Sequence, residues 1–307
     1  MLRQELAVNI PVGQIQRQKF ETIIEDFYDD FDFHLYLRGQ PGVGKTRYVK
    51  LVADRDNIIL LHLEGNVTRW LFNKKLAVYL KNAGWPSANA IPGVDFDPED
   101  LPKVVVAFDD VPTIFDPDFI KDLIIGLEEE VSDKIKYQTS LGGQYKQAEP
   151  YEREAIDHFR KDGEPGFEMN FYGRVKFIFM MNHALADEAD TEAYKKHNKM
   201  PSRNVLARLE SEAALHTRLQ YNDIHLSKDK YWGWIADLVY NTSIVDGATI
   251  DDKDEMMTWL WDKWEALQEK SVRVVKQKLW KDLNKAKSRP DFDYKGRWEN
   301  LIKTRTA

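Results

Sequence analysis

One glycine-rich stretch constrains this chain more than any other. It consists of Gly39, Gln40, Pro41, Gly42, Val43, Gly44, Lys45 and Thr46, which match the eight-residue phosphate-binding pattern at its fixed positions. Glycines allow backbone N–H groups to close around a polyphosphate without Cβ clashes. A helix that begins near Lys45 would point its positive end at the same anion. The stretch therefore predicts a nucleotide-binding loop in which Lys45 contacts the phosphates and Thr46 ligates Mg²⁺.

The segments beside this loop favour an α/β fold. Residues 33–38 are typical of a strand and residues 47–52 of a helix, which is the setting that the pattern requires. Residues 57–63 form a continuous apolar run of strand length, as expected for a strand buried in a parallel sheet.

Composition excludes several classes of protein. The chain has 307 residues, of which 43% are hydrophobic and 31% charged, as in globular proteins with room for two domains. No apolar run approaches the roughly 20 residues that span a bilayer, so we expect no membrane contact. There are no cysteines, which excludes disulfides and thiolate metal sites. The N-terminus does not resemble a signal peptide, and we expect a cytoplasmic location.

Charge is distributed unevenly along the chain. The net charge is −7, yet residues 270–307 contain 12 Lys and Arg against 4 Asp and Glu. A basic end on an acidic body fits either a local contact with an anion or nucleic acid, or an ordinary solvated helical face.

Two further strand-like segments end in polar side chains. Residues 104–108 are apolar and are followed by Asp109 and Asp110, the form of a Walker B strand. Because ligands bind at the carboxyl ends of strands in open α/β sheets, Asp109 would hold Mg²⁺ and Asp110 would orient the attacking water. Residues 175–181 end in Asn182, which could bind the same water and the γ-phosphate, or could simply cap the next turn.

Three regions follow from these patterns. We expect a lead-in helix within residues 1–30, beginning after a break at residues 10–13. Residues 31–228 would form the parallel-sheet α/β core, and residues 229–307 a small α-helical lid with the basic end.

Smaller elements are also expected within the core. Residues 134–147 suggest a hairpin around Gly142 and Gly143. Residues 187–200 are charged and suggest a mobile connector. A final strand is expected at residues 223–226.

In this order, the motifs resemble those of the AAA+ ATPases. The likeness covers roughly residues 33–287. It implies ATP and Mg²⁺ as ligands, Asn182 as the sensor-1 residue, Arg218 as an arginine finger, and Arg273 as the sensor-2 arginine of the lid. Such fingers usually act in trans, so the resemblance implies a ring, most often a hexamer. Arg208 and Arg203 are competing candidates for the finger.

Some segments resemble particular branches of that family. Most AAA+ members have Asp-Glu where this chain has Asp109-Asp110, and the shorter second acid alters the geometry around the water. Paired acids and a lysine-bearing hairpin at this place are similar to viral superfamily 3 helicases, which would fit a viral or phage-encoded chain. Residues 226–234 look as much like MoxR-type remodelling ATPases.

These resemblances lead to three functional alternatives. The first is a ring-forming motor of DNA replication, a helicase or helicase/clamp loader, that contacts single-stranded DNA through Lys134, Lys136 and Lys146. The second is a protein-remodelling chaperone that grips polypeptide with Arg69 and Trp70 from a pore loop at residues 65–70. The third is a binding module that nucleotide merely switches, and the intact set of catalytic residues counts against it.

Overall fold

The computed structural model describes residues 2–127, 133–137, 142–161, 163–198, 202–267 and 271–302. The chain forms two compact units. The helical unit comprises residues 1–25, 39–48 and 224–307, and the sheet unit comprises residues 26–38 and 49–223. The boundary between them falls within helix α1 (Leu2–Asp30) and within helix α2 (Lys45–Arg55).

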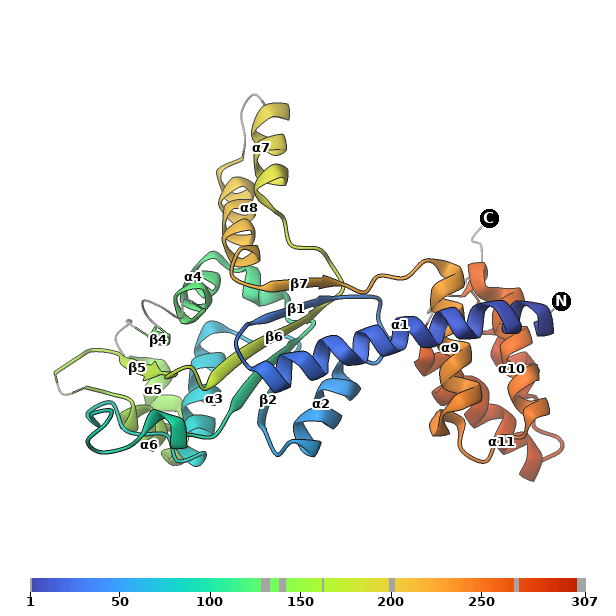
Figure 1. The fold of residues 1–307 in the computed structure, drawn as a ribbon, viewed down its shortest axis with the longest axis horizontal. Coiled ribbons are helices and arrows are strands. Elements are labelled where there is room, and N and C mark those ends of the chain that lie inside the picture. Colours follow the sequence, from blue (N-terminus) through green and yellow to red (C-terminus); the bar gives the residue numbers. More distant parts are fainter. Residues whose placement is uncertain are drawn as a thin grey trace. The chain divides into compact units, whose positions relative to one another are not determined.

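A five-stranded parallel sheet forms the centre of the sheet unit (Figure 1). Its order is β2-β3-β6-β1-β7. The strands are β1 (Leu35–Arg38), β2 (Ile59–Glu64), β3 (Val104–Asp109), β6 (Val175–Met181) and β7 (Gln220–Asp223). The protein is therefore an α/β protein with a parallel sheet and C-terminal helices, as its sequence predicts.

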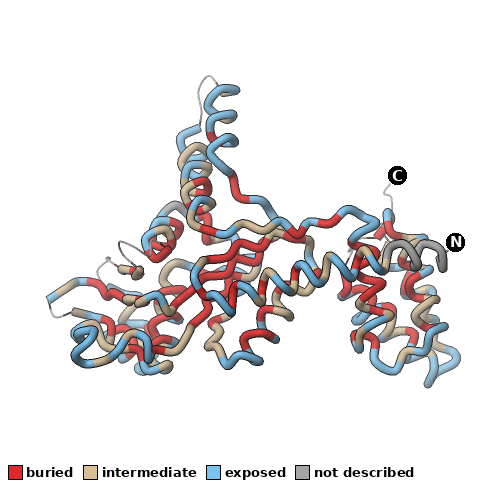
Figure 2. The backbone as a smooth tube through the Cα atoms, viewed as in Figure 1, coloured by how far each residue is buried: buried red, intermediate tan, exposed pale blue. Residues whose placement is uncertain are grey.

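Apolar residues on the inner strands build the core of this unit. Every residue of β6 is buried, and β3 is buried up to Asp109 (Figure 2). The rings of Phe108 and Phe179 stack with centroids 5.0 Å apart. Strands covered on both faces must be apolar throughout, which explains why these segments show no alternation in sequence.

Helices and a second, two-stranded sheet complete the sheet unit. Helix α3 packs against α6, and α8 packs against both α4 and α7. Their bounds are α3 (Arg69–Asn82), α4 (Pro117–Gly126), α5 (Gly143–Gln147), α6 (Pro150–His158), α7 (Glu188–His197) and α8 (Arg203–His216), with 3-10 turns at Pro98–Asp100 and Pro112–Phe115. Strand β4 (Lys134–Tyr137) pairs antiparallel with β5 (Phe167–Asn170).

The helical unit contains the C-terminal helices. These are α9 (Lys228–Asn241), α10 (Ile250–Lys263), a π-helix (Val274–Trp280) that continues into α11 (Lys281–Ser288), and α12 (Tyr294–Glu299), with 3-10 turns at Ser243–Val245 and Trp264–Ala266. Among the described residues, no helix is long and apolar enough to cross a membrane.

The predicted hairpin within residues 134–147 is wrong. Strand β4 pairs with β5, 30 or more residues later, and Gly143 begins helix α5. Ile135 and Tyr137 face Met169 and Phe167 across the ladder, so both strands bury apolar side chains. By contrast, no residue of α5 is buried. A strand in its place would therefore bury no apolar side chains against β4.

The expected connector is wrong for residues 188–197, which form helix α7, whereas residues 199 and 200 lie outside the described part of the chain. The expected break at residues 10–13 is also wrong. Asp187 and Asp190 form a capping box that starts α7, and basic residues complete its last turn. Helix α1 continues through Pro11, and Gly13 is buried against α9. A Cβ at Gly13 would lie 2.1 Å from the carbonyl carbon of Gly233, so two glycines allow the backbones to touch.

The last strand lies earlier than expected, at Gln220–Asp223 instead of residues 223–226. Its register against β1 places Tyr221 opposite Tyr36, and the two rings stack 5.3 Å apart. The backbone N–H of Gln220 donates to the carbonyl of His34, which begins the pairing at this residue.

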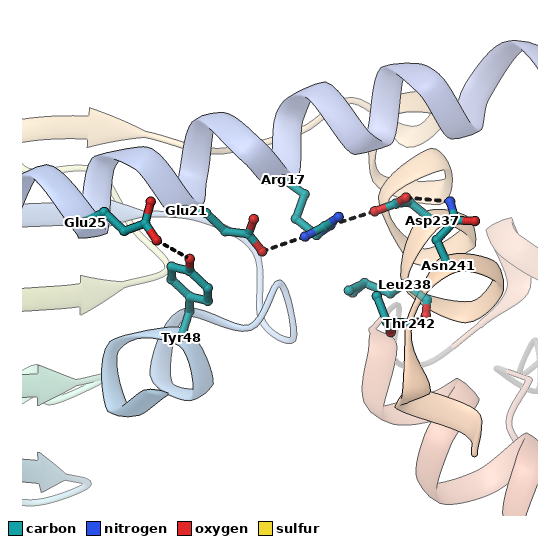
Figure 3. Close-up of polar contacts among 8 residues, drawn as sticks. All are labelled: Arg17, Glu21, Glu25, Tyr48, Asp237, Leu238, Asn241 and Thr242. Atoms are coloured by element: carbon teal, nitrogen blue, oxygen red, sulfur yellow. Dashed lines mark hydrogen bonds and ion pairs between the residues drawn. The ribbon is translucent and has the colours of Figure 1, made fainter. Parts of the chain in front are cut away.

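A buried ion pair joins α1 to α9 in the helical unit (Figure 3). Arg17 Nε lies 2.6 Å from a carboxylate oxygen of Asp237, a side chain with no exposed surface. Asn241 donates to the other oxygen at 2.8 Å, and Arg17 also binds Glu21 at 2.7 Å. The carboxylate of Asp237 thus depends on Arg17 for its countercharge.

We predict that Arg17→Met will destabilise the protein by roughly 2–4 kcal/mol, because the buried carboxylate of Asp237 would lose the guanidinium that pairs with it. Glu21→Gln removes the more exposed partner of the same arginine and should cost at most about 0.5 kcal/mol. Urea unfolding followed by tryptophan fluorescence measures both. Equal losses for the two variants would contradict the role of Asp237.

His34 gives the fold a second testable property. The side chain is buried, and its Nδ1 accepts a hydrogen bond from the backbone N–H of Phe177 at 3.0 Å. Burial, assisted by the charge of Lys176, lowers the pKa of His34 to about 3. In the unfolded chain this histidine binds a proton near pH 6.5, whereas in the folded chain it stays neutral until about pH 3. The free energy of unfolding therefore falls as the pH drops below about 6.5.

We predict that protonation of His34 in the unfolded chain lowers the free energy of unfolding by roughly 2 kcal/mol between pH 7 and pH 5. In His34→Asn the amide oxygen can still accept from Phe177 but does not titrate, so the variant should lose less over the same interval. Unfolding midpoints of both proteins across this range provide the test. Parallel pH curves would show that His34 is not the group responsible.

Candidate functional site

The glycine-rich loop leaves the carboxyl end of β1 and leads directly into α2. Gly42 and Gly44 have φ angles of +81° and +95°, in the left-handed region that glycine occupies without strain. Lys45 is the first residue of α2, and the N–H of Tyr48 donates to the carbonyl of Gly44 at 2.9 Å. The loop thus combines two left-handed glycines with the start of a helix, two features of the predicted phosphate-binding loop.

Lys45 is almost fully buried within this loop. Its Nζ donates to the carbonyl of Gly39 at 2.6 Å and lies 3.4 Å from that of Gln40. The ammonium group is therefore held at the loop. Thr46 follows it in the first turn of α2, where the sequence predicts a magnesium ligand.

Residues far away in sequence hold the loop in the helical unit. Gln40 exchanges two hydrogen bonds with the backbone of Leu226, and the hydroxyl of Tyr231 donates to the carbonyl of Pro41 at 2.8 Å. A Cβ at Gly42 would lie 2.4 Å from that of Ser271, which is fully buried. Gly42 is therefore required both by its φ angle and by this close contact.

The contact at Ser271 also brings the neighbourhood of Arg273 to the loop. Arg273 is exposed and lies two residues beyond Ser271, at the start of the π-helix. Both the loop and Arg273 belong to the helical unit. The resemblance to AAA+ proteins implies that this arginine is a nucleotide ligand, and its segment lies next to the residue that contacts Gly42.

Asp110 and Asn182 meet at the carboxyl edge of the sheet. The Asn182 amide donates to Asp110 Oδ2 at 2.7 Å, although the residues are 72 positions apart. The N–H of Asp110 donates to the carbonyl of Met180, and its φ is +48°, an uncommon value for a residue with a side chain. The hydrogen bond with Asn182 holds Oδ2 of Asp110, and Oδ1 is not part of it.

Asp109 has two neighbours that the sequence did not indicate. His62 Nε2 lies 3.2 Å from Asp109 Oδ2, and Glu64 lies directly opposite Asp109 in the ladder between β2 and β3. Ligand atoms of all three lie within 4.8 Å of one another, so they could hold a divalent cation together. His62 and Glu64 alternate with leucines in β2, but their proximity to Asp109 depends on strand pairing.

The three candidate finger arginines have different surroundings. Arg218 donates to the carbonyl of Ala214 at 2.7 Å, at the end of α8. It borders a cavity of about 440 Å³ between α7 and α8 that is also lined by three glutamates. Arg208 pairs with Glu212 at 2.7 Å, whereas Arg203 is exposed at the start of α8.

The lysines predicted to contact DNA are partly neutralised by local acids. Lys134 and Lys136 lie 3.3 and 3.7 Å from Glu168, which is buried, and Lys161 joins them at 3.3 Å. Although burial works to raise it, Lys134 and Lys161 hold the pKa of Glu168 below its usual value. Lys146 is exposed on helix α5 and not in the hairpin that the sequence predicts.

Arg69 and Trp70 are likewise engaged within the chain. They are the first residues of α3, so the expected pore loop at residues 65–70 ends before them. Arg69 forms two hydrogen bonds with Asp122, and the ring of Trp70 packs 5.4 Å from that of Tyr137. Both side chains therefore have partners within the chain.

Comparisons with known proteins add no relative. No protein-family model matches this chain, and no curated protein shows significant similarity to its sequence. What the protein does must therefore be inferred from the glycine-rich loop, the sheet edge and the charges around them.

Proposed function

We propose that this protein is an ATP-hydrolysing, ring-forming motor of the AAA+ type. The single observation that best supports the proposal is the loop at residues 39–46, which has two left-handed glycines and a lysine that begins a helix after a parallel strand. In that loop the backbone N–H groups and Lys45 would bind the β- and γ-phosphates.

The order of the strands supports a hydrolytic site at the carboxyl edge of the sheet. Strand β1 neighbours β6, and β6 neighbours β3, so the loop, Asn182 and the two aspartates each follow the carboxyl end of one of three adjacent parallel strands. Ligands of open α/β sheets bind at this edge.

Each polar residue has a role in the proposed reaction. Thr46 and Asp109 would hold Mg²⁺, which neutralises charge that develops on the phosphates. With a proton on its Nε2, His62 would donate to Asp109 and orient it as an outer-shell group, instead of ligating the ion itself. Asp110, turned by its hydrogen bond to Asn182, would orient the attacking water and accept its proton.

The ring and the nucleic-acid substrate come from the resemblance to AAA+ proteins. A guanidinium from a neighbouring subunit, here Arg218, would stabilise the transition state at each boundary. We propose DNA replication as the setting, with the protein a helicase or helicase/clamp loader. The packing of Arg69 and Trp70 within the chain weighs against the protein-remodelling alternative.

We predict that Lys45→Ala will weaken ATP binding by roughly 10- to 100-fold, the value of a charged hydrogen bond to phosphate. Asp110→Asn should bind ATP normally and lose about 10²- to 10⁴-fold in turnover, because asparagine tolerates a positive φ but cannot accept the proton. Calorimetry and phosphate release measure the two effects. Lys50→Ala, an exposed lysine on the same helix, is the matched control and should change neither.

Unchanged affinity in Lys45→Ala would remove the basis of the proposal. Full turnover in Asp110→Asn would instead reject only the role of this aspartate, and would direct attention to Glu64 and Asp109 at the same edge.

A second prediction concerns the arginine finger. Arg218→Ala should bind ATP but lose turnover by up to roughly 10³-fold in the assembled ring. Mixing it with Lys45→Ala should restore part of the activity, since some boundaries then combine an intact loop with an intact arginine. No recovery in mixed rings would point to Arg208, to Arg203 or to a residue that acts within its own subunit.

A further inference from the structure

An open groove of about 660 Å³ lies on the helical unit, along the π-helix and the start of α11. Three lysines, two amide side chains and one indole supply most of its lining: Lys276, Lys278, Lys281, Gln277, Asn284 and Trp280. Asp246 is the single acid among the described residues that line it.

Buried and exposed residues separate along this segment. Lys276, Gln277 and Lys278 are exposed in the π-helix, and Lys281 is exposed at the start of α11. Val275, Leu279 and Leu283 are buried at successive turns and anchor the opposite face. The lysines must therefore face solvent.

These three lysines differ from several other cations of the same unit. Lys263, Lys287, Lys295 and Arg297 each lie within 3.5 Å of an acidic side chain. By contrast, Lys276, Lys278 and Lys281 form no ion pair with any residue in the described part of the chain. Their charge is therefore available to a ligand.

The arrangement fits an extended polyanion better than a single phosphate. The lysines are strung along more than one helical turn and do not converge on a point, and no arginine fork is present in the lining. Lysine, glutamine and asparagine side chains typically contact nucleic-acid phosphates. Such contacts position the protein on the nucleic acid without recognising its bases. None of the exposed large apolar side chains lines the groove, so it has little to insert into a membrane.

We propose that this groove binds the phosphate backbone of single-stranded nucleic acid without sequence preference. The inference rests on the nucleic-acid part of the proposed function, but it does not depend on ATP binding. It assigns the contact to the C-terminal helices, whereas the lysines of β4 are held by Glu168.

The test measures binding of a fluorescent dT20 oligonucleotide to the full-length chain, without nucleotide, at several salt concentrations. In K276Q/K278Q/K281Q we expect affinity at low salt to fall at least tenfold. The slope of log K against log salt should become shallower by about 2, since each lost single-strand phosphate contact removes about 0.7. Basal ATP turnover and thermal stability should match those of the parent.

The control K50Q/K75Q/K121Q removes the same charge from exposed lysines on three helices of the chain. It should retain the affinity and the salt slope of the parent. Equal weakening in both triple variants would overturn the proposal, because general charge and not the groove would then explain binding. Failure of the parent to bind dT20 at low salt would overturn it as well.

Competitors identify the ligand class. A 20-base-pair duplex of random sequence should compete more weakly than dT20, and tripolyphosphate should compete only at much higher concentration. Vesicles rich in phosphatidylserine should not bind the chain. Tighter binding to duplex, to tripolyphosphate or to vesicles would each overturn the assignment to single strands. Loss of ATP binding in Lys45→Ala together with an unaffected groove would separate this inference from the ATPase.

Discussion

Parallel pairing of β3, β6 and β1 is the constraint on which the rest of the structure depends. Parallel strands all end at one edge, so polar residues that follow buried strands are brought together whatever their separation in sequence. Asp110 and Asn182 illustrate this, since they are 72 residues apart and 2.7 Å from each other. Parallel pairing of β2 with β3 places His62 and Glu64 beside Asp109. One sheet thereby assembles carboxylates, an amide and an imidazole that no local sequence motif contains.

The glycine-rich loop depends on a different set of contacts. Leu226, Tyr231 and Ser271 hold its backbone, and the absence of a side chain at Gly42 is what permits the contact with Ser271. Residues 1–25 of the first helix belong to the same unit: Glu25 accepts a hydrogen bond from Tyr48, just beyond the loop, and Arg17 binds the buried Asp237 of α9. A change in the loop would therefore be felt by α1 and by the C-terminal helices that it contacts.

Ion pairs with nearby carboxylates decide which lysines are available to bind a ligand. The lysines of β4 are conspicuous in the sequence, but β5 brings a buried glutamate to them. Lys276, Lys278 and Lys281 do not stand out in the sequence, but they line a groove in which Asp246 is the single acid among the described lining residues. An ion pair depends on which segments lie side by side. Composition alone therefore gives the sign of a segment's net charge, but not whether its charged side chains are free of partners.

The sequence by itself determined the α/β class, the glycine-rich loop and the strands that end in Asp109, Asp110 and Asn182. These features depend on local patterns: apolar runs of strand length, glycines at fixed spacing and polar residues at strand ends. Only the tertiary structure decided that β4 pairs with β5, that α1 continues through Pro11, and that Arg69 and Trp70 pack inward. Each of these outcomes depends on a partner distant in sequence. The burial gained against that partner, and not local propensity, selects the conformation.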